Sequence, residues 1–221
     1  MSDGKSASKV KPVAAGPIVY IVDDDDSMRE SLVDLFRSVR IEASSFGSAP
    51  AFLEGADLMR SGCILLDVRM PGLSGLDFQG QLERLGSTLP IIFMTGFGDI
   101  RMSVRAMKAG AIDFLTKPAR DQDILDAVAV AFEKDVQRRK ASEATEAVTA
   151  LVETLTPRER QVMDAVVKGL MNKQIAFDLG ISEITVKLHR GNVMRKMEAR
   201  TLADLVRKAE LIDAGRPKPK L

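Results

Sequence analysis

Short apolar segments alternate with amphipathic segments through the first 133 residues, and this alternation restricts the fold more than any other feature of the chain. Residues 27–39 and 99–109 place apolar side chains three and four positions apart, which is the period of an amphipathic helix. Strands that alternate with helices predict βα units and a parallel sheet. The five strand-like segments are residues 18–22, 41–45, 63–68, 90–95 and 113–116.

Two of these segments are apolar almost without interruption. Ile64, Leu65 and Leu66 follow one another, and so do the four apolar residues 91–94. A strand with one solvated face alternates apolar and polar side chains, whereas a strand covered on both faces does not. We therefore expect a doubly wound α/β domain, with helices on both faces of a five-stranded parallel sheet.

A helical pattern starts at Asp121 and contains neither proline nor glycine until Pro157. The fifth helix is therefore expected to continue into a helical linker. Thr156 and Pro157 then favour a new helix start, because threonine is a good N-cap and proline is favoured at the first helical position. No segment after Thr156 has a strand pattern.

The remaining helices have the layout of a helix-turn-helix. Residues 172–179 form a helical pattern, Gly180 and Ile181 form a tight turn, and Ser182 is a suitable N-cap for residues 183–197. A closing helix is expected at residues 202–211. The predicted division is a disordered tail at 1–17, an α/β domain at 18–133, a helical linker at 134–152, an all-α four-helix domain at 153–214 and a basic tail at 215–221.

Charge is distributed unevenly between the two predicted domains. Residues 18–133 carry 18 acidic and 11 basic side chains, whereas residues 151–221 carry 14 basic and 9 acidic ones. An acidic half suits a cation site, and a basic half suits a phosphate-rich partner. The chain has no apolar run of roughly 18 residues, and its first 17 residues lack the apolar core of a secretion signal. We expect a cytoplasmic protein with no membrane partner.

Carboxylates follow two of the predicted strands. Asp23 and Asp24 end the first strand and Asp67 ends the third. The carboxyl ends of parallel strands lie along one edge of a sheet, so these residues are expected to converge there. Gathered carboxylates repel one another unless a cation is present, and an all-oxygen ligand set suits Mg²⁺. The alternative is a solvated acidic loop that caps the following helix.

A hydroxyl and an ammonium group are expected at the same edge. Thr95 ends the fourth strand and Lys117 follows the fifth. An aspartate that accepts a phosphoryl group needs a metal, an ammonium and a hydroxyl to neutralise the transferred oxygens. Asp67 with these two partners therefore predicts a phosphoryl-transfer site. The lone cysteine, Cys63, is expected to be a buried structural thiol rather than a disulfide or zinc ligand.

Four segments resemble the successive motifs of the response-regulator receiver family: VDDDDSMRESL, LLDVRMPGLSG, IIFMTGFGD and AIDFLTKPA. The resemblance covers residues 18–132 and implies the strand order 2-1-3-4-5 and a partner histidine kinase. It implies the following roles: Asp67 as phospho-acceptor; Asp23, Asp24, Asp67 and the backbone carbonyl of Arg69 as Mg²⁺ ligands; Thr95 and Phe114 as switch residues; Lys117 as phosphate-binding residue; and Pro118 as a cis-proline.

The segment from Leu155 to Ala209 resembles the LuxR-type helix-turn-helix family, and the two domains together are similar to the FixJ branch of response regulators. Turning the helix at 183–197 by about 100° per residue places Val186, Val193 and Met197 toward the domain interior. The opposite face would enter the major groove of DNA. The predicted DNA contacts are Ile184, Lys187, Leu188, Gly191 and Arg195, with Arg190 beside them and Lys173 on the preceding helix.

These features predict a DNA-binding response regulator of a two-component system. Phosphorylation of Asp67 would switch dimerisation and DNA binding, with promoter DNA and RNA polymerase as further partners. Two alternatives stay open: a phosphatase that uses the same crevice on an outside substrate, and an adaptor whose receiver is never phosphorylated. The intact acceptor set argues against the adaptor, and the lack of a separate general acid argues against an enzyme.

Overall fold

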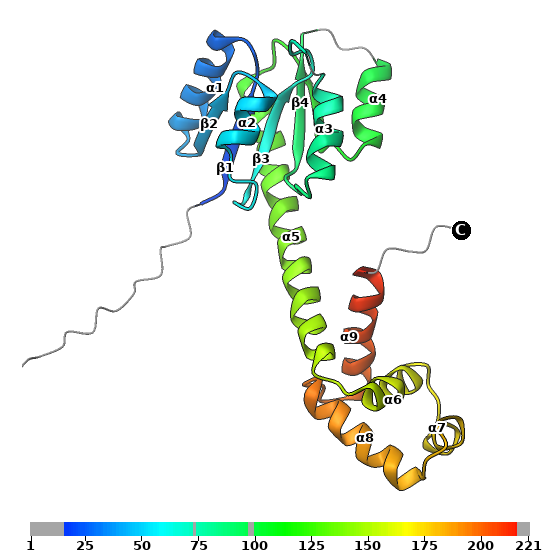
Figure 1. The fold of residues 1–221 in the computed structure, drawn as a ribbon. Helices are drawn as coiled ribbons and strands as arrows, with labels where there is room; N and C mark the ends of the chain where they lie inside the picture. Colours follow the sequence, from blue (N-terminus) through cyan, green and yellow to red (C-terminus); the bar gives the residue numbers. More distant parts are fainter. Residues whose placement is uncertain (1–15, 73, 97–99, 216–221) are drawn as a thin grey trace, which may run out of the picture. The chain divides into compact units, whose positions relative to one another are not determined.

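The computed structural model describes residues 16–72, 74–96 and 100–215 of the chain (Figure 1). The chain divides into two compact units, the first ending at Gln137 and the second beginning at Arg138. This boundary lies within one long helix, α5 (Asp121–Glu153). Most of both predicted tails lies outside the described residues. Among the described residues, no helix is long and apolar enough to cross a membrane.

The first unit contains a five-stranded parallel sheet of order β2-β1-β3-β4-β5, which confirms the predicted fold class and strand order. Three strands differ by one residue from the expected bounds: β2 lies one residue later, β3 one residue earlier, and β4 begins at Ile91 instead of Pro90. Pairing sets these bounds, because Ile18 of β1 lies opposite both Glu42 and Gly62. The strands are β1 (Ile18–Val22), β2 (Glu42–Phe46), β3 (Gly62–Asp67), β4 (Ile91–Thr95) and β5 (Asp113–Thr116).

Helices cover both faces of this sheet, as the apolar strands predict (Figure 1). One core contains Tyr20 and Leu66 from the strands, with Phe52 of α2 and Phe78 of α3. The other contains Ile21 and Leu65, with side chains of α1 and α5. Adjacent strand residues thus enter opposite cores. The helices are α1 (Asp26–Ser38), α2 (Ala49–Gly55), α3 (Gly75–Arg84), α4 (Ile100–Lys108) and α5; Asp99, the expected start of α4, lies outside the described residues.

A buried carboxylate ties α5 to the amino end of β3. Asp135 is fully buried, and its Oδ2 accepts hydrogen bonds from the Ser61 hydroxyl at 2.7 Å and the Gly62 amide at 3.1 Å. A Cβ at Gly62 would lie 2.1 Å from the Ile18 carbonyl oxygen, so only glycine fits here. Burial, together with the nearby charge of Asp135, raises the pKa of the Cys63 thiol. Cys63 is therefore a buried, inert thiol, as expected.

The second unit is entirely helical over its described residues, as predicted. Its core combines Val148 and Val152 at the end of α5 with Val162, Ile175 and Val186 of later helices. These later helices are α6 (Pro157–Val167), α7 (Asn172–Leu179), α8 (Glu183–Lys196) and α9 (Leu202–Gly215).

The turn between α7 and α8 follows the expected chemistry. Gly180 ends α7 in the left-handed region with φ of 64°, a conformation that suits glycine. Ser182 caps α8 by accepting a hydrogen bond from the Thr185 amide at 3.1 Å. The two helices are thus joined as a helix-turn-helix.

The start of α6 is fixed to the end of α8 through Glu159. Thr156 and Glu159 form a capping box, and Glu159 Oε2 also accepts a hydrogen bond from Lys196 Nζ at 2.6 Å. Lys196 donates as well to the Thr154 carbonyl oxygen at 3.0 Å. The hydrogen bond from Lys196, with that from the Thr156 backbone, lowers the pKa of Glu159 to about 2.

Replacing Asp135 by alanine is expected to destabilise the first unit by about 1–3 kcal/mol, because it leaves buried donors without their acceptor. The free energy of unfolding from urea titrations measures this loss. Asp126→Ala removes an exposed carboxylate from the same helix and is expected to change that free energy by less than about 0.5 kcal/mol. Equal effects of the two substitutions would contradict the anchoring role of Asp135.

Glu159 gives the second unit a defined dependence on pH. Because folding lowers its pKa from 4.5 to about 2, its contribution to stability is complete above pH 4.5 and is lost as the pH falls toward 2. The difference in unfolding free energy between the wild type and Glu159→Gln should shrink over that interval. Urea titrations followed by circular dichroism measure it, with Glu210→Gln on the exposed face of α9 as the control. A difference that stays constant from pH 5 to pH 2 would refute this assignment.

Candidate functional site

Three carboxylates meet where β1 and β3 end. Asp67 is the last residue of β3, while Asp23 and Asp24 follow β1 directly. One carboxylate oxygen from each residue lies within 4.8 Å of the others. Asp23 and Asp67 are buried, whereas Asp24 is exposed. The sequence prediction that these residues converge at one edge of the sheet agrees with this geometry.

The four consecutive aspartates after β1 have different contacts. Asp23 Oδ1 accepts a hydrogen bond from the Asp25 amide at 3.0 Å. The Asp25 carboxylate caps α1 by accepting from the amides of Ser27 and Met28. Asp26 forms an ion pair with Arg29. Within this acidic run, Asp25 thus caps α1, whereas Asp23 and Asp24 belong to the carboxylate cluster.

Lys117 joins the last strand to the carboxylates. Its Nζ lies 2.5 Å from Asp23 Oδ2 and 3.1 Å from Asp67 Oδ1. Burial lowers the pKa of Lys117, but the hydrogen bonds and charges of the two aspartates outweigh burial and raise it. Lys117 is therefore a firmly charged ammonium group in contact with Asp67.

Asp67 itself is held in a partly desolvated position. Burial raises the pKa of its carboxyl group, while Lys117 and the Arg69 amide act in the opposite direction. The Arg69 amide donates to Asp67 Oδ2 at 3.1 Å. A carboxylate that loses hydration beside two others is stabilised by a bound cation.

The donor set fits Mg²⁺. It consists of oxygen atoms from three carboxylates, and exposed Asp24 leaves one side open to water and to further ligands. The ammonium of Lys117 neutralises only part of the negative charge of the cluster. The residues at this edge can therefore bind a divalent cation beside Asp67.

The other predicted residues of this site lie on the neighbouring strands. Thr95 is fully buried at the end of β4, and its carbonyl oxygen accepts a hydrogen bond from the Lys117 amide at 2.7 Å. Phe114 of β5 lies opposite Phe93 of β4 and is partly buried in the core that contains α3 and α4. The peptide bond between Lys117 and Pro118 is cis.

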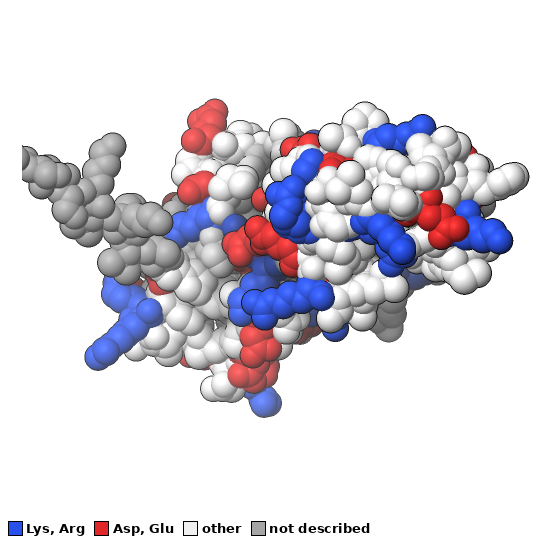
Figure 2. Space-filling view, turned by 90° about the horizontal axis from the view of Figure 1, so that it is seen from below, with Lys and Arg blue, Asp and Glu red and all other residues white. Residues whose placement is uncertain are grey.

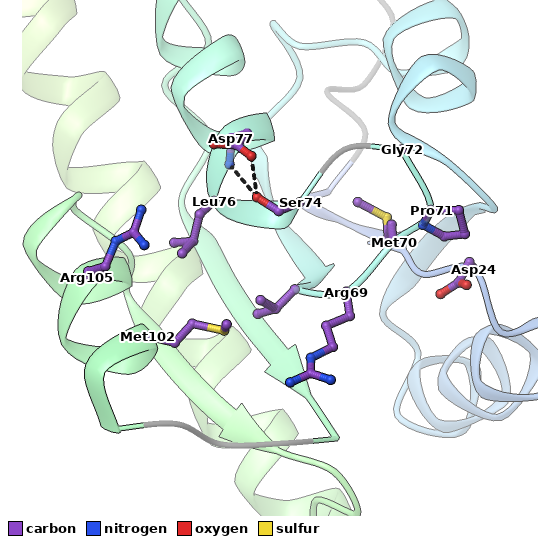
Figure 3. A pocket seen from close by; sticks show the side chains of 11 residues that line it. Asp24, Arg69, Met70, Pro71, Gly72, Ser74, Leu76, Asp77, Met102 and Arg105 are labelled. Atoms are coloured by element: carbon purple, nitrogen blue, oxygen red, sulfur yellow. Dashed lines mark hydrogen bonds between the residues drawn. The ribbon is translucent and has the colours of Figure 1, made fainter.

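A pocket of about 720 Å³ borders Asp24 of the carboxylate cluster. Figure 3 shows Asp24 on one side of it and Met102 and Arg105 of α4 on the other, with Arg69 between them. Ser74, the N-cap of α3, is held there by Asp77. The pocket thus extends from Asp24 to the first turns of α4.

Arg29 was missed by the sequence reasoning. Its guanidinium donates to the Asp23 carbonyl oxygen at 2.8 Å. The spacing of three between Asp26 and Arg29 on one helix is a recognisable ion-pair signal. That spacing does not reveal the contact with Asp23, which depends on the path of the chain between β1 and α1.

The outward face of α8 in the second unit carries exposed apolar side chains. Ile184 is 80% exposed and Leu188 is 64% exposed. Lys187, Gly191 and Arg195 are exposed as well, whereas Val186, Val193 and Met197 are buried, so the predicted division of faces holds. A Cβ at Gly191 would meet no atom within 4 Å, so packing within the chain does not require glycine there.

Two basic residues beside this face have different surroundings. Lys173 is exposed near the start of α7. Arg190 is partly buried, and its Nη1 donates to Asn172 Oδ1 at 2.7 Å, which links α8 to the start of α7. Arg190 therefore already has a partner within the helix-turn-helix.

Basic side chains do not form one continuous patch on the face that Figure 2 presents. Lys and Arg side chains are separated there by uncharged and acidic ones. Net positive charge alone therefore does not mark the nucleic-acid interface. The face of α8 that carries exposed Ile184, Leu188 and Lys187 stays the predicted interface.

Two family models match the chain. Residues 19–129 match "Response regulator receiver domain", and residues 153–209 match "Bacterial regulatory proteins, luxR family". The first match contains the carboxylate cluster and Lys117, and the second contains the helix-turn-helix.

The chain is also similar to proteins that contain both domains. Nodulation protein W of Bradyrhizobium diazoefficiens is 56% identical over 195 residues, covering 88% of this chain and 86% of that protein. The response regulator StyR has a solved structure with a TM-score of 0.76 and 48% identity, covering 89% of this chain and 99% of that one. Full-length FixJ from B. japonicum gives a TM-score of 0.54 and 39% identity, covering 90% and 98%. The chain belongs to the response regulators of the FixJ type, DNA-binding transcription regulators that join a receiver domain to a LuxR-type helix-turn-helix domain.

Proposed function

We propose that a partner histidine kinase phosphorylates Asp67 and that this step controls DNA binding by α8. The observation that carries the proposal is the convergence of Asp23, Asp24 and Asp67 within 4.8 Å, with Lys117 Nζ 3.1 Å from Asp67. Asp23, Asp24, Asp67 and the backbone carbonyl of Arg69 would hold Mg²⁺. The kinase as phosphodonor and promoter DNA as target follow from the two domains.

The proposed transfer needs no further catalytic group from the chain. One Asp67 carboxylate oxygen attacks phosphorus as the bond between phosphorus and the phosphodonor breaks, so the carboxylate becomes an acyl phosphate. Bound Mg²⁺ supplies charge neutralisation on the transferred oxygens. Lys117 gives up part of its contact with Asp67 and binds a phosphoryl oxygen. The domain acts only in its own phosphorylation and dephosphorylation, not on an outside substrate.

The proposed switch uses Thr95 and Phe114. A phosphoryl group on Asp67 adds nearly two negative charges. The Thr95 hydroxyl moves toward it and donates a hydrogen bond, which vacates space for the Phe114 ring to rotate inward. This changes the surface formed by α4 and β5, and pairing of two chains follows.

In the second unit, the outward face of α8 enters the major groove of promoter DNA. Lys187 and Arg195 bind phosphate or guanine, Leu188 contacts a thymine methyl group, and Ile184 adds apolar contact. Gly191 lets the helix approach closely. Lys173 binds phosphate, and Arg190 contributes at the edge of this face while it holds Asn172. The protein acts in the cytoplasm, where it meets DNA and RNA polymerase.

Replacing Asp67 by asparagine is expected to abolish labelling by radioactive acetyl phosphate, because the amide is not a nucleophile toward phosphorus. Removing Mg²⁺ with a chelator should stop labelling of the wild type as well. Asp57→Asn changes an exposed aspartate that caps the Met59 amide, and this control should label normally. Persistent labelling of Asp67→Asn would show that another residue is the acceptor.

Replacing Lys187 by alanine is expected to weaken specific DNA binding by about 1–3 kcal/mol if the side chain contacts a base. Lys173→Ala should weaken binding to all sequences alike and reduce the salt slope by about 1. Lys168→Ala, at the end of α6 beside Val152 and Ile212, is the control. Fluorescence anisotropy with a labelled operator measures all three. An unchanged operator affinity of Lys187→Ala would reject this placement of α8.

A further inference from the structure

We infer that Arg29 is a positioning residue for the metal-binding carboxylates: it fixes the peptide group between Asp23 and Asp24 and thereby raises the affinity for Mg²⁺. This inference rests on the Mg²⁺ site of the proposed function. Asp23 and Asp24 precede α1 directly, and Arg29 reaches back to them from the first turns of that helix.

The contacts of Arg29 lead to the main chain of Asp23. Nη1 donates to the Asp23 carbonyl oxygen at 2.8 Å, and Nη2 forms an ion pair with Asp26. The Arg29 side chain is only 18% exposed, whereas that of Asp26 is 83% exposed. The contact with Asp23 is therefore the more protected of the two.

Every hydrogen-bonding group of Asp23 has a partner. Its amide donates to the Phe46 carbonyl oxygen at 3.2 Å, and its two carboxylate oxygens accept from the Asp25 amide and from Lys117. Arg29 supplies the remaining partner, the donor to the carbonyl oxygen. Rotation of the peptide group that leads to Asp24 would break this last hydrogen bond.

The neighbouring strand leaves room for this guanidinium. Gly47 follows the end of β2, and a Cβ there would lie 3.4 Å from Arg29 Nη1. Arg29 thus lies between the end of β2 and the loop that carries the two metal-binding aspartates. A fixed guanidinium at this point holds the exposed Asp24 in place through its backbone.

The positive charge of Arg29 lowers the affinity for Mg²⁺, whereas its hydrogen bond to Asp23 raises that affinity. A positive charge near a cation site repels Mg²⁺, so loss of that charge alone would tighten binding. The ion pair with exposed Asp26 and screening by salt reduce this repulsion. Loss of the hydrogen bond to Asp23 leaves the metal-binding loop less ordered and weakens binding. Removing the charge would tighten Mg²⁺ binding, whereas removing the hydrogen bond would weaken it. The Mg²⁺ affinity of a variant without Arg29 therefore shows which effect is larger.

Calorimetric titration of the full chain with MgCl₂ tests the inference. Arg29→Ala is expected to raise the dissociation constant for Mg²⁺ about tenfold, the scale of lost support for a metal ligand. Arg29→Lys keeps the charge but cannot bridge Asp23 and Asp26, and is expected to weaken binding as well. Asp26→Asn removes only the exposed ion pair and should leave the constant within about twofold.

The same helix provides a matched control. Arg37 forms an ion pair with Asp34 at the same spacing of three, and both side chains are more than 70% exposed. Arg37→Ala should leave Mg²⁺ binding unchanged. Acetyl phosphate labelling gives a second readout: Arg29→Ala should need about tenfold more Mg²⁺ for half-maximal rate, while its rate at saturating Mg²⁺ equals that of the wild type.

Two outcomes overturn the inference. Mg²⁺ binding by Arg29→Ala that is as tight as that of the wild type, or tighter, means that Arg29 does not position the carboxylates. Wild-type binding by Arg29→Lys means the same, because this variant keeps the charge but cannot bridge Asp23 and Asp26. If the wild type and Arg37→Ala also fail to bind Mg²⁺, the proposed metal site itself is wrong, and the role of Arg29 is rejected with it.

Discussion

The contact of Lys117 with Asp23 and Asp67 holds together the edge of the sheet on which the receiver site depends. It joins the residue after β5 to the ends of β1 and β3, across the full width of β4. One ammonium group balances only part of the charge of three carboxylates. Lys117 therefore holds this edge together, and the edge keeps a net negative charge that suits a divalent cation.

The buried, apolar sheet keeps the strand ends in fixed positions, so the charged residues at those ends stay close together. β1, β3 and β4 are buried over their whole length, and each is hydrogen-bonded on both sides. Parallel pairing allows no change of register without moving apolar side chains from one core to the other. The carboxylates at the strand ends therefore stay within reach of one another, and only side chains and the loops beyond the strands can adapt.

The sequence predicts this arrangement well where it follows from the strands and poorly where it depends on single side-chain contacts. Asp23, Asp24 and Asp67 could be grouped because parallel strands end at one edge, and Val186 and Val193 could be assigned to the interior because helical periodicity is strong. Asp135, Arg29 and Lys196 could not be found, since their partners lie at other elements and spacing along the chain does not reveal them. Arg190 was expected beside the DNA-binding face, and its partner Asn172 was not foreseen.

The two ends of β3 have different contacts, and these contacts limit which elements can move when Asp67 changes. Asp67 ends the strand, while Gly62 at its start donates to Asp135 of α5, roughly 17 Å away at about 3.3 Å per residue. β3 is paired with β1 and β4, so its register is fixed and its anchor to α5 stays in place. In the proposed switch, a change at Asp67 therefore spreads sideways through β4 and β5, which carry Thr95 and Phe114. The surface expected to respond in this proposal is thus on the side of α4, while the buried carboxylate of Asp135 holds α5 to the start of β3.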